Sequence, residues 1–143
     1  MDDTGALTTA HRPDTARALL EGVVATLSLG DHQLHLACDD GLRLAAHQAA
    51  AVETIVREAL ANAVAHAFPG DRRGTVWLSL HRVEGRLRLR IKDDGIGIAD
   101  TDLEVMPGLA RIARAAEAMG GYARMGSASR SGGEVVAVFP DAA

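Results

Sequence analysis

The sequence predicts a single α/β domain, a two-layer sandwich in which a mixed sheet carries its helices on one face. Segments with strand-like alternation and segments with helical spacing interleave along the chain. One strand of a predicted hairpin alternates charged and apolar residues, as expected for a sheet with one wet and one buried face. The 143 residues suit one domain, and 48% hydrophobic with 3% aromatic residues indicates an aliphatic core.

The first predicted elements are a helix and a short strand. Residues 1–12 have no periodic pattern and are expected to form a flexible tail ahead of a domain over residues 13–143. Asp14 is expected to cap the helix, because a short acceptor side chain satisfies free amides at a helix start. Leucine and valine then recur at helical spacing up to Gly30, and Gln33–Cys38 alternates as a strand.

The later elements follow from the same two periodicities. They are a long helix over about His47–Phe68 that ends at Pro69-Gly70, strands over Thr75–His81 and Arg86–Asp93, a helix over about Leu109–Met119, and strands over Tyr122–Met125 and Glu134–Phe139. Glu84-Gly85 supplies the turn of the hairpin, and Gly120-Gly121 stops the last helix.

The second hairpin strand carries a run of positive charge on alternate residues, Arg86, Arg88, Arg90 and Lys92. Leucine and isoleucine occupy the positions between them, so the two sets point to opposite faces of the sheet. We interpret the charged set as a solvated sheet face rather than a nucleic-acid patch, since the whole chain has a net charge of −4.

The same alternation predicts an unusual place for Asp93. It falls in register with the apolar residues and should point toward the helices, whereas Asp94 points away. A carboxylate on a core face is costly unless it is paired or hydrogen-bonded. Gly95-Ile96-Gly97 follows, where the missing side chains allow a sharp turn or a close approach to a ligand. This pattern fits a tight turn after a strand or a ligand site.

Glu58, Asn62 and His66 form a polar line on the long helix. They lie four residues apart and so share one face of an otherwise apolar helix. The line is consistent with a satisfied core network or with a site for a metal ion and phosphate, because Mg²⁺ takes oxygen ligands and keeps several waters. Gly108-Leu109 at the start of the last helix is either an ordinary loop or a phosphate site built from free helix amides.

Order and spacing together give these motifs a family likeness. The segment Arg57–Pro69 resembles the N box, Lys92–Ile98 the first glycine box and Gly108-Leu109 the second glycine box of the GHKL superfamily. That superfamily takes in gyrase, a heat-shock chaperone, histidine kinases and mismatch-repair ATPases. The His-Ala-Phe-Pro ending of the N box is similar to that of HWE-type sensor histidine kinases. The resemblance covers roughly residues 14–140.

The resemblance implies the Bergerat ATP-binding fold, with ATP between the helical layer and a lid. For the adenine end, it implies that Asp93 accepts a hydrogen bond from the adenine amino group and that Gly95 and Gly97 shape the pocket. For the phosphate end, it implies that Asn62 coordinates Mg²⁺, that His66 lies near the phosphates, and that Gly108 and Leu109 present helix amides to the phosphates. Glu58 is then expected to orient or activate the nucleophile. From the residues alone, His66 also fits a packed helix position.

Two departures from the family pattern limit the expected activity. The second box is Met106-Pro107-Gly108-Leu109, without its first glycine and with a proline that lacks an amide donor. The lid between Ile98 and Pro107 is short. Nucleotide binding is therefore better supported than fast turnover. The second departure is larger. A complete histidine kinase needs a helical hairpin that dimerises and presents the phosphoacceptor histidine, whereas the segment before the N box is already used by a helix and a strand. We therefore expect the phosphoacceptor histidine on a separate protein.

The resemblance thus predicts a Mg·ATP-binding catalytic domain of a bacterial histidine kinase, a transferase of two-component signalling. A serine kinase of the anti-sigma-factor type and a non-catalytic nucleotide-binding interaction module are the alternatives. The single cysteine Cys38, the lack of a signal-peptide pattern and the lack of an apolar run of about 20 residues favour a cytoplasmic protein without a membrane partner.

Overall fold

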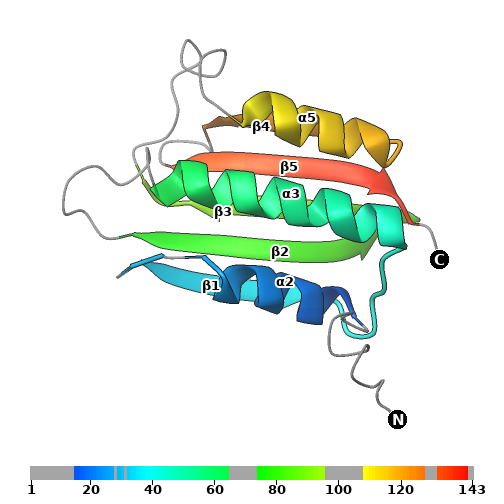
Figure 1. Cartoon of the computed structure of the whole chain (residues 1–143), viewed down its shortest axis with the longest axis horizontal. Coiled ribbons are helices and arrows are strands. Elements are labelled where there is room, and N and C mark those ends of the chain that lie inside the picture. The colour runs from blue at the N-terminus through cyan, green and yellow to red at the C-terminus, as the bar shows by residue number, and fades with distance from the viewer. Residues whose placement is uncertain are drawn as a thin grey trace.

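The computed structural model describes residues 15–27, 29–30, 32–64, 74–95, 108–127 and 132–141. Its strands form a five-stranded sheet, and its helices cover one face of that sheet (Figure 1). The elements are α2 (Ala16–Ala25), β1 (Gln33–Cys38), α3 (Ala46–Asn62), β2 (Thr75–Val83), β3 (Arg86–Asp93), α5 (Leu109–Ala118), β4 (Tyr122–Ser127) and β5 (Gly133–Pro140). The predicted two-layer α/β sandwich is confirmed.

The sheet is mixed, with the strand order β1-β2-β3-β5-β4. β1 pairs with β2 in parallel, and the other neighbours are antiparallel. The β2–β3 hairpin closes through Glu84-Gly85, whose φ angles of 52° and 79° are both positive. Two positive φ angles in a two-residue loop are typical of the hairpin turn whose twist matches that of the strands. Glycine at the second position makes this turn accessible.

The first helix differs from its prediction at both ends. Thr15, not Asp14, is its N-cap: the Thr15 side chain accepts a hydrogen bond from the Ala18 amide at 3.2 Å. A threonine hydroxyl serves this purpose as an aspartate does, and the two residues are adjacent in the sequence. The helix ends at Ala25, before the predicted stop at Gly30, and the Thr26 hydroxyl donates to the carbonyl of Val23 at 2.8 Å.

The longest described helix is α3, with 17 residues. Its predicted end at Pro69-Gly70 lies outside the described residues. No helix in the described part of the chain is both long enough and apolar enough to cross a membrane. Near its start, the buried Gln48 donates to the Pro140 carbonyl at 2.8 Å and accepts from the Ala45 amide at 3.0 Å. One side chain thus joins the first turn of α3 to the last residue of β5.

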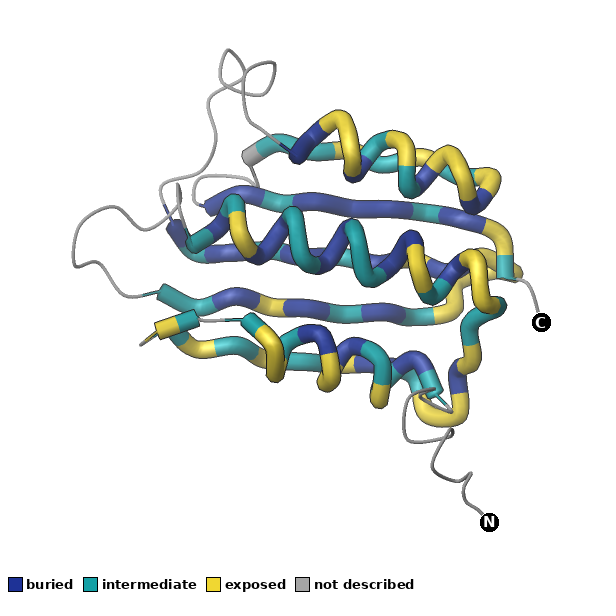
Figure 2. The backbone as a smooth tube through the Cα atoms, viewed as in Figure 1, coloured by how far each residue is buried: buried dark blue, intermediate teal, exposed yellow. Residues whose placement is uncertain are grey.

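The core lies between the helices and the sheet and is aliphatic, as the composition predicts. Figure 2 shows the buried segments along β3, β5 and the sheet-facing side of the helices. Alternate residues of β2 and β3 point into this layer and are almost completely buried: Val76, Leu78, Leu80, Leu87, Leu89 and Ile91. They pack with residues such as Ile55, Leu60 and Ile112 of the helices and with Phe139 of β5. Cys38, a free thiol, is buried in the same layer.

Candidate nucleotide site

Asp93 is the last residue of β3 and points into the helical side of the sheet, as the alternation predicts. Its exposed fraction is 6%. The backbone amides of Gly95 and Gly133 donate to its Oδ1 at 2.8 and 3.0 Å. These bonds offset part of the cost of burying a carboxylate. Because both of them end on Oδ1, Oδ2 keeps its acceptor capacity with respect to the described residues.

Gly133, the first residue of the neighbouring strand β5, holds this carboxylate, and Gly132 before it packs against the backbone of Asp93. Gly132 has φ +76°, and a Cβ atom there would lie 1.6 Å from the Asp93 carbonyl oxygen. The Gly132 amide donates to the Gly95 carbonyl at 2.9 Å. Sequence reasoning missed both glycines as site residues. The available signal was a Gly-Gly pair directly before an apolar strand, which is typical of close backbone approach.

Asp94, the residue after Asp93, has a structural contact with the start of β2. Its Oδ1 accepts from the Thr75 amide at 2.8 Å, and its own amide donates to the Thr75 carbonyl at 3.2 Å. These bonds fix the end of β3 against the start of β2. The backbone that enters the glycine-rich segment is therefore anchored on one side by Thr75 and on the other by Gly132.

A small recess brings Asp93 together with residues of α3 and α5. It has a volume of about 20 Å³ and is lined by Ala59, Asn62, Ala63, Ile91, Asp93, Leu109, Gly133, Glu134 and Val135. The Asn62 amide nitrogen is buried and has no hydrogen-bond partner among the described residues. A buried polar atom without a partner costs about 1–3 kcal/mol. The volume is close to that needed for one water molecule.

Glu58 lies one helical turn before Asn62 and is held by a residue that sequence reasoning missed. Arg111 of α5 donates to its two carboxylate oxygens, from Nε at 2.8 Å and from Nη2 at 3.3 Å. The hydrogen bond to Glu58 and the negative charge of that carboxylate raise the pKa of Arg111 above its ordinary value. The Arg111 side chain is 59% exposed, and that of Glu58 is 25% exposed. The pair bridges α3 and α5 beside the recess.

Gly108 is the N-cap of α5 and allows Glu58 to approach the helix start. Its φ is +92°, and a Cβ atom there would lie 2.2 Å from Glu58 Oε1. An anion beside the first turn of a helix is stabilised by the free amides and by the helix dipole. The predicted anion position at the start of α5 thus borders the Glu58 carboxylate.

The structure places most of the predicted site residues around one region. Asn62, Asp93 and Leu109 line the recess, Gly95 binds Asp93, and Glu58 meets Gly108 next to it. His66 and Gly97 lie outside the described residues, as do Met106 and Pro107. The roles given to His66 and Gly97 stay predictions.

Comparison with known proteins gives the family. Residues 47–143 match the family described as "Histidine kinase-, DNA gyrase B-, and HSP90-like ATPase". The fold is similar to the histidine kinase domain of the Erythrobacter litoralis EL346 blue-light activated histidine kinase, with a TM-score of 0.72 and 21% identity over 90% of this chain and 64% of that one. It is also similar to the ATP binding domain of PrrB from Mycobacterium tuberculosis, with a TM-score of 0.68 and 25% identity over 90% of this chain and 96% of that one.

The chain is also similar in part of its sequence to anti-sigma factors. The Anti-sigma F factor of Bacillus thuringiensis (strain Al Hakam) and that of Bacillus mycoides (strain KBAB4) are each 39% identical over 51 residues. The match covers 36% of this chain and 35% of each relative, so the chain spans about a third of their length. The family match covers more than half of the chain, and the fold agrees with it. The chain therefore belongs to the histidine kinase-, DNA gyrase B- and HSP90-like ATPases, the GHKL superfamily.

Proposed function

We propose that the chain binds Mg·ATP beside α3 and α5 and transfers the γ-phosphate to a histidine of a separate protein in two-component signalling. The observation that carries this proposal is that two polar side chains, those of Asp93 and Asn62, line the same mainly apolar recess. The buried Asp93 carboxylate keeps an oxygen available, and the buried Asn62 amide nitrogen has no partner among the described residues. Membership of the ATPase family supports the use of ATP.

Asp93 is the proposed adenine-recognising residue. Its Oδ1 is fixed by two backbone amides, so the direction of Oδ2 is set before a ligand arrives. The exocyclic amino group of adenine is a donor that complements this acceptor. Gly95 and, by the family pattern, Gly97 shape the surrounding wall. Apolar lining residues such as Ile91 and Leu109 suit the faces of a planar base.

Asn62 is the proposed protein ligand of Mg²⁺. Magnesium keeps several waters and takes few protein ligands beside phosphate oxygens, so one side-chain amide oxygen fits this role. The buried, unpartnered nitrogen of the same side chain indicates that Asn62 is placed for a group that the described residues do not supply. When bound, the ion neutralises phosphate charge, which is the main electrostatic requirement of phosphoryl transfer.

The start of α5 and the polar face of α3 are the proposed phosphate end of the site. Gly108 and Leu109 begin α5, whose first amides are available to anions. His66 is proposed to lie near the phosphates on the same face of the long helix. Glu58 is proposed to orient or activate the nucleophile. In the structure its carboxylate binds Arg111, so the guanidinium competes with the nucleophile for this acceptor.

The Arg111→Gln variant tests this competition. Loss of the guanidinium frees Glu58, and because the pair is exposed the substitution has little effect on stability. We expect the slow intrinsic hydrolysis of ATP to rise by up to about fivefold, with nucleotide affinity unchanged. The measurement is a steady-state phosphate-release assay. Arg114→Gln, on the exposed side of the same helix, is the control. A fall in the rate with Arg111→Gln would instead place Arg111 on the phosphates.

Calorimetric titration tests the function as a whole. We expect a non-hydrolysable ATP analogue to bind with Mg²⁺ and to bind more weakly without it. A guanine analogue should fail to bind, because its O6 acceptor would face the Asp93 carboxylate. If millimolar ATP analogue does not bind in either condition, the chain is a non-catalytic interaction module, a reading that the altered Met106-Pro107-Gly108-Leu109 box also fits.

The match to the Anti-sigma F factors favours a second candidate, a serine kinase of the anti-sigma type. The two candidates share the nucleotide site and differ in the phosphorylated residue. Phosphohistidine contains an acid-labile P–N bond, whereas phosphoserine survives acid. Acid treatment of the labelled acceptor protein therefore separates them: loss of label supports the histidine kinase, and retention of label supports the serine kinase.

A further inference from the structure

The sheet face opposite the helices, the outer face, carries a distinctive set of side chains. Strand alternation sends the core residues of β2 and β3 toward the helices and the residues between them to the other side. The register places His35, Trp77 and Lys92 side by side on β1, β2 and β3. Figure 1 shows the helices gathered on the other side of the sheet, so none of them covers this row.

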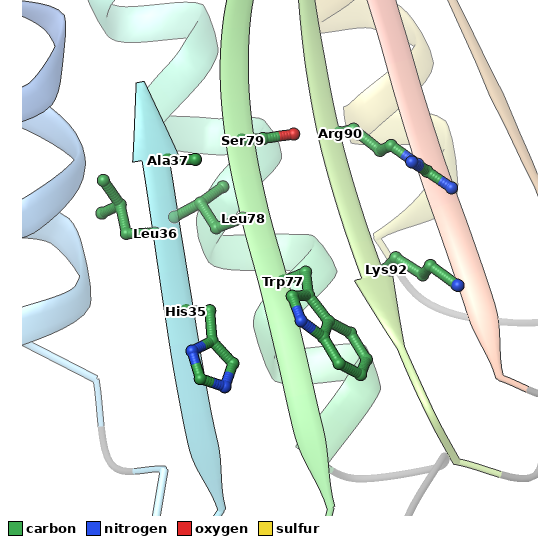
Figure 3. Close-up of a pocket in the computed structure, with 8 residues that line it drawn as sticks. All are labelled: His35, Leu36, Ala37, Trp77, Leu78, Ser79, Arg90 and Lys92. Atoms are coloured by element: carbon green, nitrogen blue, oxygen red, sulfur yellow. The ribbon is translucent and has the colours of Figure 1, made fainter. Parts of the chain in front are cut away.

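Trp77, the sole tryptophan of the chain, lies on the outer face near the start of β2. Its exposed fraction is 40%. The His35 ring stacks on it with the centroids 6.1 Å apart and an interplanar angle of 19°, and Lys92 Nζ lies 5.7 Å from its ring centroid. These residues, with Ser79 and Arg90, line a hollow of about 350 Å³. Figure 3 shows their side chains on β1, β2 and β3. The contacts on both sides limit the freedom of the indole, so little of it is left to lose on binding.

The exposed large hydrophobic residues belong to this same face, on β2 and on the edge strand β4. Among the described residues, the large hydrophobic side chains that are exposed are Trp77, Val83 and Tyr122. Residues paired across neighbouring strands point to the same face. Val83 pairs with the outward Arg86, and Tyr122 pairs with Val138, which in turn pairs with the outward Arg88, so Val83 and Tyr122 share the outer face with Trp77. Aromatic residues and arginine together are the composition that distinguishes protein interfaces from ordinary surface.

Positive charge is also concentrated there, although the chain has a net charge of −4. The outward cations of the strands are Arg86, Arg88, Arg90, Lys92 and Arg124. The outward acid of the described strands is Glu134, which is already paired with Arg90. At the edge of the outer face, the Asp39 carboxylate accepts a hydrogen bond from the Arg82 backbone amide and also contacts His81. The bond from Arg82, and after it the contact with His81, lower the pKa of Asp39. No ion pair involves Arg86, Arg88 or Arg124 within the described part of the chain.

We propose that the outer face is a docking surface for an acidic segment of another protein, which sets an apolar side chain against Trp77 and carboxylates against the cations of β3. Charge decides between the possible occupants. A second copy face to face would oppose arginine to arginine, and the negative charge of the whole chain opposes a nucleic-acid backbone. The surface lies across the sheet from the recess, so docking does not require nucleotide.

The test is a binding titration with a fluorescein-labelled octapeptide in which glutamates flank one leucine. Binding is followed by the anisotropy of the label and by the emission of Trp77, which reports on this face directly. The same peptide with glutamine in place of glutamate is the matched ligand. We expect binding of the acidic peptide that weakens with added salt, and at least tenfold weaker binding of the glutamine peptide.

Protein variants locate the binding. Arg88→Glu and Trp77→Ser should each weaken the acidic peptide about tenfold, whereas Arg114→Glu on the exposed side of α5 should leave it unchanged. Circular dichroism confirms that each variant is folded, and Asp93→Asn should bind the peptide normally, which separates this proposal from the nucleotide site. The proposal is overturned if Arg88→Glu and Arg114→Glu have equal effects or if Trp77→Ser has none. It is also overturned if a single-stranded oligonucleotide binds more tightly than the peptide, or if the chain self-associates and Arg88→Glu disperses the assembly.

Discussion

Asp93→Asn is expected to lower the affinity for an ATP analogue by about 100-fold, or about 3 kcal/mol. The reason lies in the fixed orientation of the side chain. The amides of Gly95 and Gly133 require an oxygen, so the single oxygen of asparagine turns toward them. Its NH₂ group then faces the recess, and one donor opposes another where the adenine amino group is proposed to lie.

The measurement is calorimetric titration in the presence of Mg²⁺. Asp94→Asn is the control, because it makes the same chemical change one residue later, at a side chain that binds Thr75 instead of facing the recess. We expect the control to keep the affinity of the unaltered chain within about twofold. Equal affinity in Asp93→Asn and Asp94→Asn would exclude Asp93 as the adenine-recognising residue.

Gly132→Ala is expected to destabilise the fold by about 3 kcal/mol or more, which corresponds to a Tm lower by roughly 10 °C for a chain of this size. The new Cβ would lie 1.6 Å from the Asp93 carbonyl oxygen. The backbone fixes the position of both atoms, so no rotamer change relieves the overlap. The positive φ of +76° adds strain for any residue with a side chain.

A thermal melt measures this effect, and Gly126→Ala provides the comparison. A Cβ at Gly126 of β4 meets no atom within 4 Å, so its stability should stay equal or rise slightly. If Gly132→Ala and Gly126→Ala have the same Tm, then the segment before β5 does not press against the end of β3 in solution. If Gly132→Ala is folded but displaced, the Gly133 amide leaves Asp93 and nucleotide affinity falls with it.

Local periodicity predicted the fold and the direction of several site residues. The strand period of two placed Asp93 on the core face, and the helical spacing placed Glu58 and Asn62 on one side of α3. Both are properties of neighbouring residues, which a sequence displays directly. The N-cap was wrong by one residue because Asp14 and Thr15 both carry suitable oxygens, and local chemistry does not decide between them.

Contacts between residues far apart in the sequence could not be predicted from the sequence. Arg111 meets Glu58 across 53 positions, and Gly133 meets Asp93 across 40. Such pairs depend on the crossing of α3 with α5 and on the register of β3 with β5. Single residues do not reveal either quantity, although the Gly-Gly pair at the start of β5 was a visible sign of a crowded backbone.

β3 serves two chemically different surfaces with one stretch of eight residues. Its even and odd positions can be exchanged independently, because a substitution on one side leaves the side chains of the other in place. Length is the exception. A single residue inserted before Lys92 would reverse every following side chain, bringing the lysine into the apolar layer and turning the carboxylate out to water. We therefore expect β3 to vary in composition among related chains far more readily than in length.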